Sequence, residues 1–322
     1  MNPLKDRSVL YSALAGILYG LFCRLAFTLK WAQNLVGVMS IGFLLVMPMA
    51  AGFISVFLAE RAGRRGPGTW LGLPVLTTVA LIVGSFLFFW EGIICLTMLM
   101  PIALVMAILG GGVGAFCARR FGKTPLVCVA ILPFAVAAAE RWTGPVYEVR
   151  EVATSIAIQA PPAVVWREIE RVPPVRAAEQ RFSWSQKIGF PRPIEATLSG
   201  EGVGAVRHAT FAGGVLFIET VTDWEPERRL GFDIRADAVN IPPRVLDEHV
   251  TIGGPYFDTL HGEYRIEPRN GGTLLHLSSR HRLSTTFNFY ARIWTSAVMR
   301  DIQENILYVI RNRCEQAARQ NR

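Results

Sequence analysis

Histidine side chains are the first candidates for chemistry, because imidazole can act as an acid, a base or a metal ligand near neutral pH. All five histidines lie in the second half of the 322-residue chain, at positions 208, 249, 261, 276 and 281. His276 and His281 occupy one predicted strand, but a spacing of five residues points them to opposite faces and excludes a simple metal pair on that strand. His281 shares its face with leucines at 275, 277 and 283. We interpret it as a histidine of the core or rim, with ligand binding or acid–base chemistry as the alternative.

Other spacings predict no familiar reaction. Four of the five cysteines lie in apolar segments and Cys314 stands alone, which gives neither a zinc-binding pattern nor a disulfide framework. The glycine-rich run at 200–204 is followed by strand-like alternation rather than by a helix, so it predicts a turn and not a dinucleotide-binding loop. Glu219 and Asp223 lie four residues apart on one strand face and are interpreted as solvated. We therefore predict no cofactor and no metal, and we assign no catalytic residue.

Charge and apolar content divide the chain into two halves. The chain is 51% hydrophobic and 18% charged, but residues 1–140 hold only 10 of its 33 Lys and Arg residues and 4 of its 25 Asp and Glu residues. This composition disfavours a purely soluble enzyme and predicts a membrane-embedded first half. The net charge of +8 comes mostly from that half, as expected of basic residues that flank membrane spans. The second half mixes acidic with basic residues, which disfavours nucleic-acid binding.

Several segments of the first half are long enough to cross a bilayer, which takes about 20 apolar residues. Three uncharged stretches meet this length, Val36–Leu58, Leu71–Trp90 and Ile93–Ala118. Ser8–Leu29 is a further span although Arg24 interrupts it, since an arginine near a helix end can extend its guanidinium to the interface. Glycines at 16 and 20, and the glycine-rich run at 110–114, predict close packing between helices.

A fifth apolar segment determines the side of the membrane on which the polar half lies. Thr124–Ala139 has only 16 uncharged residues and contains Pro125 and Pro133, so it either crosses or lies partly in the interface. Basic residues mark alternate loops, which the positive-inside rule places in the cytoplasm. We favour five spans and a polar half outside the cytoplasm; with four spans it would lie inside. We expect an integral protein of a bacterial inner membrane.

The second half alternates as strands do, and we predict a transmembrane helical domain over 1–143 and a second domain over 144–322. Periodicity predicts a strand at 151–159, a short helix at 163–171 and a long amphipathic helix at 287–320. Six further strands are predicted at 194–199, 205–212, 215–224, 229–235, 256–267 and 273–285. Short connections between consecutive strands indicate an antiparallel meander, and hence a seven-stranded antiparallel sheet. The insertion at 238–254 is interpreted as a lid or a rim.

Three motifs carry a resemblance to a known family. They are Ile158-Gln-Ala-Pro-Pro-Ala-Val-Val-Trp166, Gly202-Val-Gly-Ala-Val-Arg207 and Val221-Thr-Asp-Trp-Glu-Pro-Glu-Arg-Arg-Leu-Gly-Phe232. With the order of elements, they resemble the α+β helix-grip fold of the START-like, or SRPBCC, superfamily, which includes polyketide cyclases/dehydrases and lipid-transfer proteins. The resemblance covers residues 150–318 and implies a curved sheet around the C-terminal helix, with an apolar cavity between them. The apolar first half resembles the membrane-anchored bacterial branch.

The expected cavity defines the candidate site. The polar groups placed to orient a ligand are Tyr264, His281 and a strand threonine such as Thr220. The expected walls are Trp224, Phe232, Ile266, Leu277, Trp294 and Val298. We hypothesise that the domain binds or transfers a lipid-like hydrophobic molecule beside the membrane. Two alternatives stay open: a cyclase- or dehydratase-like enzyme that uses His281 or Tyr264 as acid–base group, and a membrane scaffold whose domain has a filled core.

Overall fold

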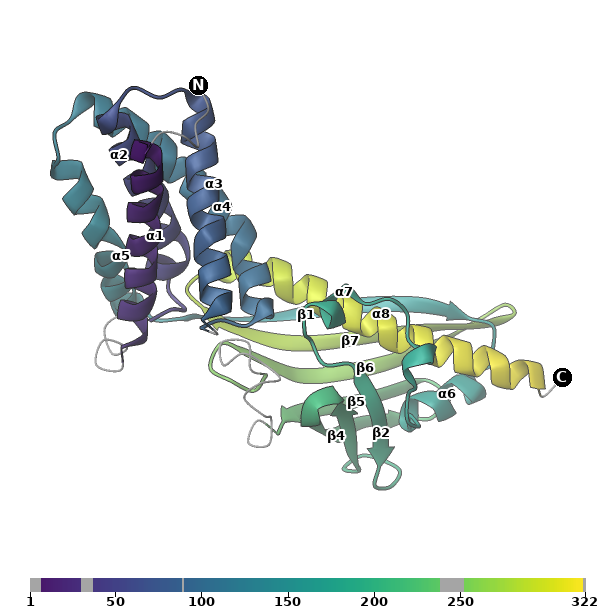
Figure 1. The fold of residues 1–322 in the computed structure, drawn as a ribbon. Helices are drawn as coiled ribbons and strands as arrows, with labels where there is room; N and C mark the ends of the chain where they lie inside the picture. The colour runs from purple at the N-terminus through teal and green to yellow at the C-terminus, as the bar shows by residue number, and fades with distance from the viewer. Residues whose placement is uncertain (1–6, 30–36, 89, 238–251, 321–322) are drawn as a thin grey trace. The chain divides into compact units, whose positions relative to one another are not determined.

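The computed structural model describes residues 7–29, 37–88, 90–237 and 252–320, and the chain divides into two units (Figure 1). A helical unit comprises Met1–Pro145 together with Thr285–Phe287. A sheet unit comprises Val146–Ser284 and Asn288–Arg322. Most of the predicted insertion at 238–254 lies outside the described residues.

Within its described residues, the helical unit has five apolar helices long enough to span a membrane. They are α1 (Arg7–Thr28), the π-helical turn η2 (Gly42–Val46) continued by α2 (Met47–Ala62), α3 (Pro67–Leu87), α4 (Ile93–Arg120) and α5 (Thr124–Thr143). The fifth helix is longer than its uncharged stretch, because residues 140–143 continue the last turn. Pro125 lies in its first turn, where the missing N–H has no helical partner. Length and composition therefore suit five spans.

Glycines let these helices approach closely, as their spacing predicts. A Cβ atom on Gly114 of α4 would lie 2.6 Å from the carbonyl oxygen of Phe53 on α2. A Cβ atom on Gly110 would lie even closer to the carbonyl oxygen of Met49, and one on Gly16 would lie 2.9 Å from that of Ala51 on α2. A Cβ atom on Gly20 would meet the side chain of Leu81 on α3. Gly112, by contrast, has no described atom within 4 Å of the position that a Cβ atom would take. One face of the glycine run therefore packs α4 directly against α2.

Three acidic side chains of the helical unit form ion pairs or hydrogen bonds with helices that are distant in sequence. Glu91, in the turn between α3 and α4, forms an ion pair with Arg24 of α1 at 2.8 Å. Glu60 of α2 forms one with Arg119 of α4 at 3.2 Å. The carboxylate of Glu140 accepts hydrogen bonds from the backbone N–H groups of residues 41 and 42, at 2.8 and 3.0 Å. Its negative charge thus stabilises the N-terminal end of the helix that begins with η2.

The described part of the sheet unit has seven strands in the order β1-β7-β6-β5-β4-β3-β2. The strands are β1 (Val146–Ile158), β2 (Pro193–Leu198), β3 (Val206–Phe211), β4 (Val215–Glu225), β5 (Arg229–Ala236), β6 (Phe257–Arg269) and β7 (Gly272–Thr285). From β2 to β7 each strand pairs antiparallel with its successor, which confirms the predicted meander. Gly271, with a φ of +85°, closes the β6–β7 hairpin in a backbone conformation that glycine adopts without strain.

Helices cover one face of this sheet. They are α6 (Pro162–Glu170), α7 (Trp184–Lys187) and the long C-terminal α8 (Asn288–Gln320), with short 3₁₀ turns η3 (Ala177–Glu179) and η4 (Ala212–Gly214) in the connections. Figure 1 shows α8 running along the sheet. Its buried apolar residues include Val298, Val309 and Ile310, of which Val298 and Val309 belong to the apolar face predicted from the sequence. An antiparallel sheet with a long helix on one face fits the helix-grip arrangement.

Candidate functional site on the inner face of the sheet

Alternate side chains of the sheet point toward the covering helices, and we call this side the inner face. On β7 the inner face consists of Thr273, Leu275, Leu277, Ser279, His281 and Leu283, all buried. On β1, burial alternates in the same way from Val152 to Ile158. His276 lies on the outer face and is bonded to Glu267 at 3.3 Å. The two histidines of β7 thus lie on opposite faces, as predicted.

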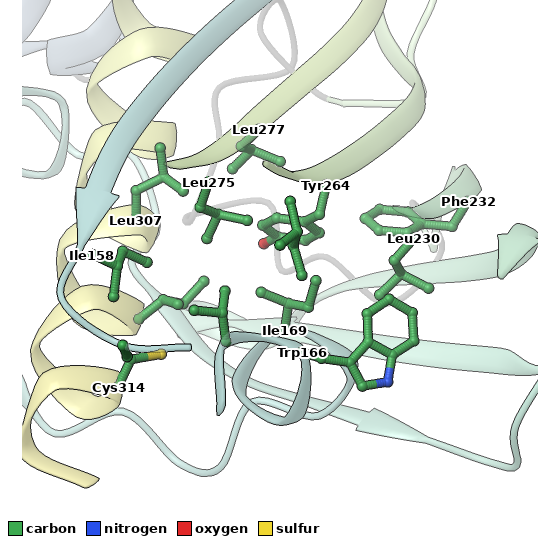
Figure 2. Packing of buried hydrophobic residues seen from close by; sticks show 14 of the residues in the cluster. Ile158, Trp166, Ile169, Leu230, Phe232, Tyr264, Leu275, Leu277, Leu307 and Cys314 are labelled. Carbon is green, nitrogen blue, oxygen red and sulfur yellow. The ribbon is translucent and has the colours of Figure 1, made fainter. Parts of the chain in front are cut away.

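Several predicted site residues belong to one packed apolar cluster (Figure 2). They are Phe232, Tyr264, Ile266 and Leu277, each at most 4% exposed. Side chains of α6 and α8 complete the cluster. Trp224 packs at its edge, with its ring centre 5.1 Å from that of Trp166. Full burial of a large apolar side chain contributes roughly 1.5–3 kcal/mol, so these residues stabilise the core of the sheet unit.

Thr220 does not lie on the inner face, contrary to the prediction. The inner-face residues of β4 are Val215, Phe217, Glu219 and Val221, which leaves Thr220 exposed on the outer face. A β-bulge between Val221 and Asp223 shifts the alternation by one residue, so Trp224 packs on the inner side despite its even number. Strict alternation would place Thr220 on the same face as Trp224, and the bulge between them makes that assignment wrong. For the same reason Glu219 is buried, and the prediction that it is solvated was wrong.

A buried ion pair occupies the inner face of β3 and β4. Arg207 and Glu219 are register partners, their side chains are 4% and 8% exposed, and Arg207 Nη1 donates to the carboxylate of Glu219. The guanidinium also donates to the carbonyl oxygen of Ile169 on α6 at 3.4 Å, and it lies 5.3 Å from the ring centre of Phe232. Tyr264 is an electrostatic neighbour of this pair. Burial raises the pKa of Tyr264, so its hydroxyl keeps its proton near neutral pH.

Gln303 attaches the middle of α8 to the sheet. Its side-chain nitrogen donates to Ser279 Oγ at 2.9 Å and to the carbonyl oxygen of Val152 at 3.0 Å. Its side-chain oxygen accepts a hydrogen bond from Thr154 at 3.0 Å. These bonds join α8 to both β1 and β7, and they satisfy the buried polar atoms next to His281 along β7.

Asp301, two residues earlier on α8, fixes the start of α7 and the residues before it. Its carboxylate accepts hydrogen bonds from the hydroxyls of Ser183 and Ser185, both at 2.6 Å, and pairs with Arg181 at 3.1 Å. Burial raises the pKa of Asp301, but these hydrogen bonds outweigh it and leave the pKa below its ordinary value. The buried carboxylate is therefore ionised, and both of its oxygens are bonded to protein groups.

His281 differs from these groups because its side chain makes no hydrogen bond to any described residue. It is 0% exposed, yet neither ring nitrogen has a hydrogen-bond partner in the described part of the chain. The ring centre lies 5.6 Å from that of Phe257 on β6. Its charged neighbours are Arg150 and Glu148 of β1, which are bonded to each other at 2.6 Å. Because buried polar groups are nearly always satisfied by protein, water or ligand, the imidazole is a candidate for binding a further hydrogen-bonding group.

The two predicted site residues on α8 lie in its N-terminal half. Val298 is buried, and Trp294 is half-buried with its ring centre 6.4 Å from that of Trp184 on α7. Neither belongs to the packed cluster around Tyr264. The predicted residues outside the packed cluster are therefore His281, Trp294 and Val298, besides Thr220 on the outer face.

Stability should depend on pH through His281. Burial, together with the charge of Arg150, lowers the pKa of His281, so the native chain holds the imidazole neutral. When the pH falls below the ordinary pKa of histidine, His281 takes up a proton in the unfolded chain but not in the native chain. The free energy of unfolding therefore decreases until the pH reaches the lower pKa that His281 has in the native chain. We expect His281→Leu to lose less thermal stability than the parent chain when the pH is lowered from about 7.5 to about 5 in detergent. His276→Leu is the control on the outer face; equal losses in the parent and His281→Leu chains would contradict this assignment.

A separate groove of about 720 Å³ opens at the end of the sheet next to α6. Its lining mixes both charges and consists of Pro162, Glu225, Pro226, Glu227, Arg228, Arg229, Arg265, Ile266, Glu267 and Pro268. Ile266 joins this lining to the predicted site, but His281 is not part of it. Over residues 7–29, 37–88, 90–237 and 252–320, no group of three or more His, Cys, Asp or Glu side chains is placed to hold a metal ion.

No protein-family model and no curated protein matches the chain. Among solved structures, a protein from Thermus thermophilus is similar at 19% identity, with 52% of this chain and 99% of that one covered and a TM-score of 0.34. The di-domain ARO/CYC BexL from the BE-7585A biosynthetic pathway is similar at 14% identity, over 64% and 63% of the two chains, with a TM-score of 0.34. DynU16 from the dynemicin biosynthetic locus is similar at 16% identity, over 49% and 45%, with a TM-score of 0.29. At these values the function has to be argued from the chain's own residues.

Proposed function

We propose that this chain is a membrane-anchored protein of the START-like type whose sheet unit binds a hydrophobic small molecule against the inner face. The order of the seven strands and α8 supports the fold, and five apolar helices support the anchor. The observation that carries the proposal is His281, a fully buried imidazole whose two nitrogens lack a partner in the described chain. A bound molecule with an apolar body and a polar end would supply that partner while filling an otherwise apolar site.

The linker between the two units supports a membrane-dissolved ligand. Two residues, Gly144 and Pro145, separate the end of α5 from the start of β1. If the helical unit is embedded in a bilayer, so short a linker keeps the binding unit near it. A ligand dissolved in the bilayer is then present at a high effective concentration for the binding unit.

One end of the sheet unit also has a surface suited to lipid. The amide of Asn288 donates to the carbonyl oxygen of Val146 at 2.6 Å, which holds the first residues of α8 and β1 together. Large apolar side chains are at least half exposed at this end, namely Tyr147, Val149, Phe289 and Ile293. Exposed apolar and aromatic groups of this kind suit the headgroup region of a bilayer.

Copurification tests the proposal. The full chain is purified in a mild detergent, exchanged extensively and extracted with organic solvent, and the extract is analysed by mass spectrometry. We expect one hydrophobic species in near-stoichiometric amount, and we expect its re-addition to raise the melting temperature of the delipidated chain. A chain that carries no such species, and that no membrane extract stabilises, would favour the scaffold alternative.

The buried group formed by Arg207, Glu219 and Tyr264 favours a second candidate function, a cyclase- or dehydratase-like reaction on the bound molecule. A phenol that stays protonated can donate a proton or a hydrogen bond to a substrate oxygen. In that case Tyr264→Phe should abolish conversion of the copurified molecule and leave its binding unchanged. Conversion that survives this substitution would exclude Tyr264 as the acid–base group.

A further inference from the structure

The charges of the inner face are the starting point for a conclusion about the ligand, which rests on the proposed function. In the described part of the sheet unit, the buried charged side chains are Arg207, Glu219 and Asp301. Arg207 and Glu219 neutralise each other, and Asp301 is paired with Arg181. Each of these charges therefore has its counter-charge within the protein.

The charges beside His281 are balanced in the same way. Arg150 would be the natural partner of an anionic ligand, but its guanidinium is bonded to Glu148 on the same strand at 2.6 Å. On β6, Phe257 lies against the imidazole and Thr259 is its register partner, and neither carries a charge. A carboxylate or phosphate bound beside His281 would be a buried ion without a free counter-charge, which is strongly unfavourable in an apolar environment.

The imidazole itself defines what the ligand must offer. A neutral imidazole has one N–H donor and one nitrogen acceptor. Burial lowers the pKa of His281, which agrees with a neutral ring. A hydroxyl group both donates and accepts, so it can bond to either nitrogen without bringing a charge.

We propose that the ligand of the sheet unit is an uncharged lipid with a hydroxyl end, and that His281 binds this hydroxyl. Fatty acids and lipid phosphates of the same chain length are then discriminated against, because Arg150 and Glu148, the charged neighbours of His281, neutralise each other. The chemistry fits a long-chain or isoprenoid alcohol or an acylglycerol, and the test below uses the simplest member of this class.

Photo-crosslinking of the full chain in nanodiscs of zwitterionic lipid tests the proposal. Three probes share one diazirine- and alkyne-bearing hexadecyl chain and differ only in their end, which is an alcohol, a carboxylic acid or a phosphate monoester. We expect the alcohol to label peptides of β7 and of the N-terminal half of α8 at least about tenfold more than either acid, because an acid would have to bury its charge without a counter-charge. His281→Leu should lower alcohol labelling about tenfold, and His281→Gln, which keeps a donor and an acceptor, should lower it less.

His276→Leu is the matched control, because it removes the same side chain from the outer face of the same strand. The melting temperatures of all variants show that they are folded. Equal or stronger labelling by an acid, or alcohol labelling that is unchanged in folded His281→Leu, would overturn the proposal and leave ligand binding by the sheet unit intact. No labelling of the sheet unit by any of the three probes would count against the proposed function itself.

Discussion

Replacement of Glu219 by alanine should lower the local stability of β3 and β4 by about 3–5 kcal/mol, because it leaves the guanidinium of Arg207 buried without its counter-charge. The remaining partners of Arg207, the carbonyl oxygen of Ile169 and the ring of Phe232, do not neutralise it. Hydrogen exchange of β3 and β4 amides, measured by mass spectrometry on the full chain in nanodiscs, reports this loss as faster exchange.

Two comparisons make this result specific. The double variant Arg207→Met with Glu219→Leu removes both charges, so it should recover most of the stability that the single variant loses. Glu267→Ala removes a half-exposed carboxylate that pairs with Arg269, and we expect it to cost less than about 1 kcal/mol. If Glu219→Ala cost no more than Glu267→Ala, the pair would not be the buried interaction described above.

Replacement of Gly110 by leucine should prevent the helical unit from packing. The first added carbon would overlap the carbonyl oxygen of Met49, and a backbone atom of a packed helix cannot move aside as a side chain can. Overpacking of this kind costs about 3 kcal/mol or more, and the helices of a membrane protein depend on such close contacts. We expect the variant to aggregate during size-exclusion chromatography in detergent, or to melt at a clearly lower temperature.

Gly112 provides the control on the same helix. A Cβ atom there meets no described atom within 4 Å, so Gly112→Leu adds an apolar side chain on an open face of α4. We expect it to change stability by less than about 1 kcal/mol, helped by the better helix propensity of leucine. A Gly112→Leu chain as unstable as Gly110→Leu would show that the effect comes from the substitution type and not from the α2–α4 contact.

The meander from β2 to β7 and the presence of the long helices could be predicted because they depend on local signals. Alternation, turn glycines and uncharged stretches act over a few residues, so the meander and the long C-terminal helix follow from sequence alone. The separation of His276 and His281 is equally local, since it needs only the period of a strand. The lengthening of the fifth helix to residue 143 could not be read from hydropathy, because Glu140 and Arg141 are charged but still helical.

The error at Thr220 has a physical cause that a simple alternation rule does not contain. One bulge on β4 separates Trp224 from the residues before it, so a face assigned from the tryptophan is inverted upstream. The signal that could have identified Glu219 was present, since it shares parity with the apolar residues at 215, 217 and 221. Its partner Arg207 comes from another strand, and only the β3–β4 register brings the two together.

The carboxylate of Glu140 has a mechanical consequence for the whole protein. It ties the last turn of α5 to the beginning of a second helix, one turn before α5 ends at Thr143. A pull on the chain beyond α5 is therefore resisted by two helices rather than by the fraying end of one. In a Glu140→Ala chain the same load would act on the last turn of α5 alone.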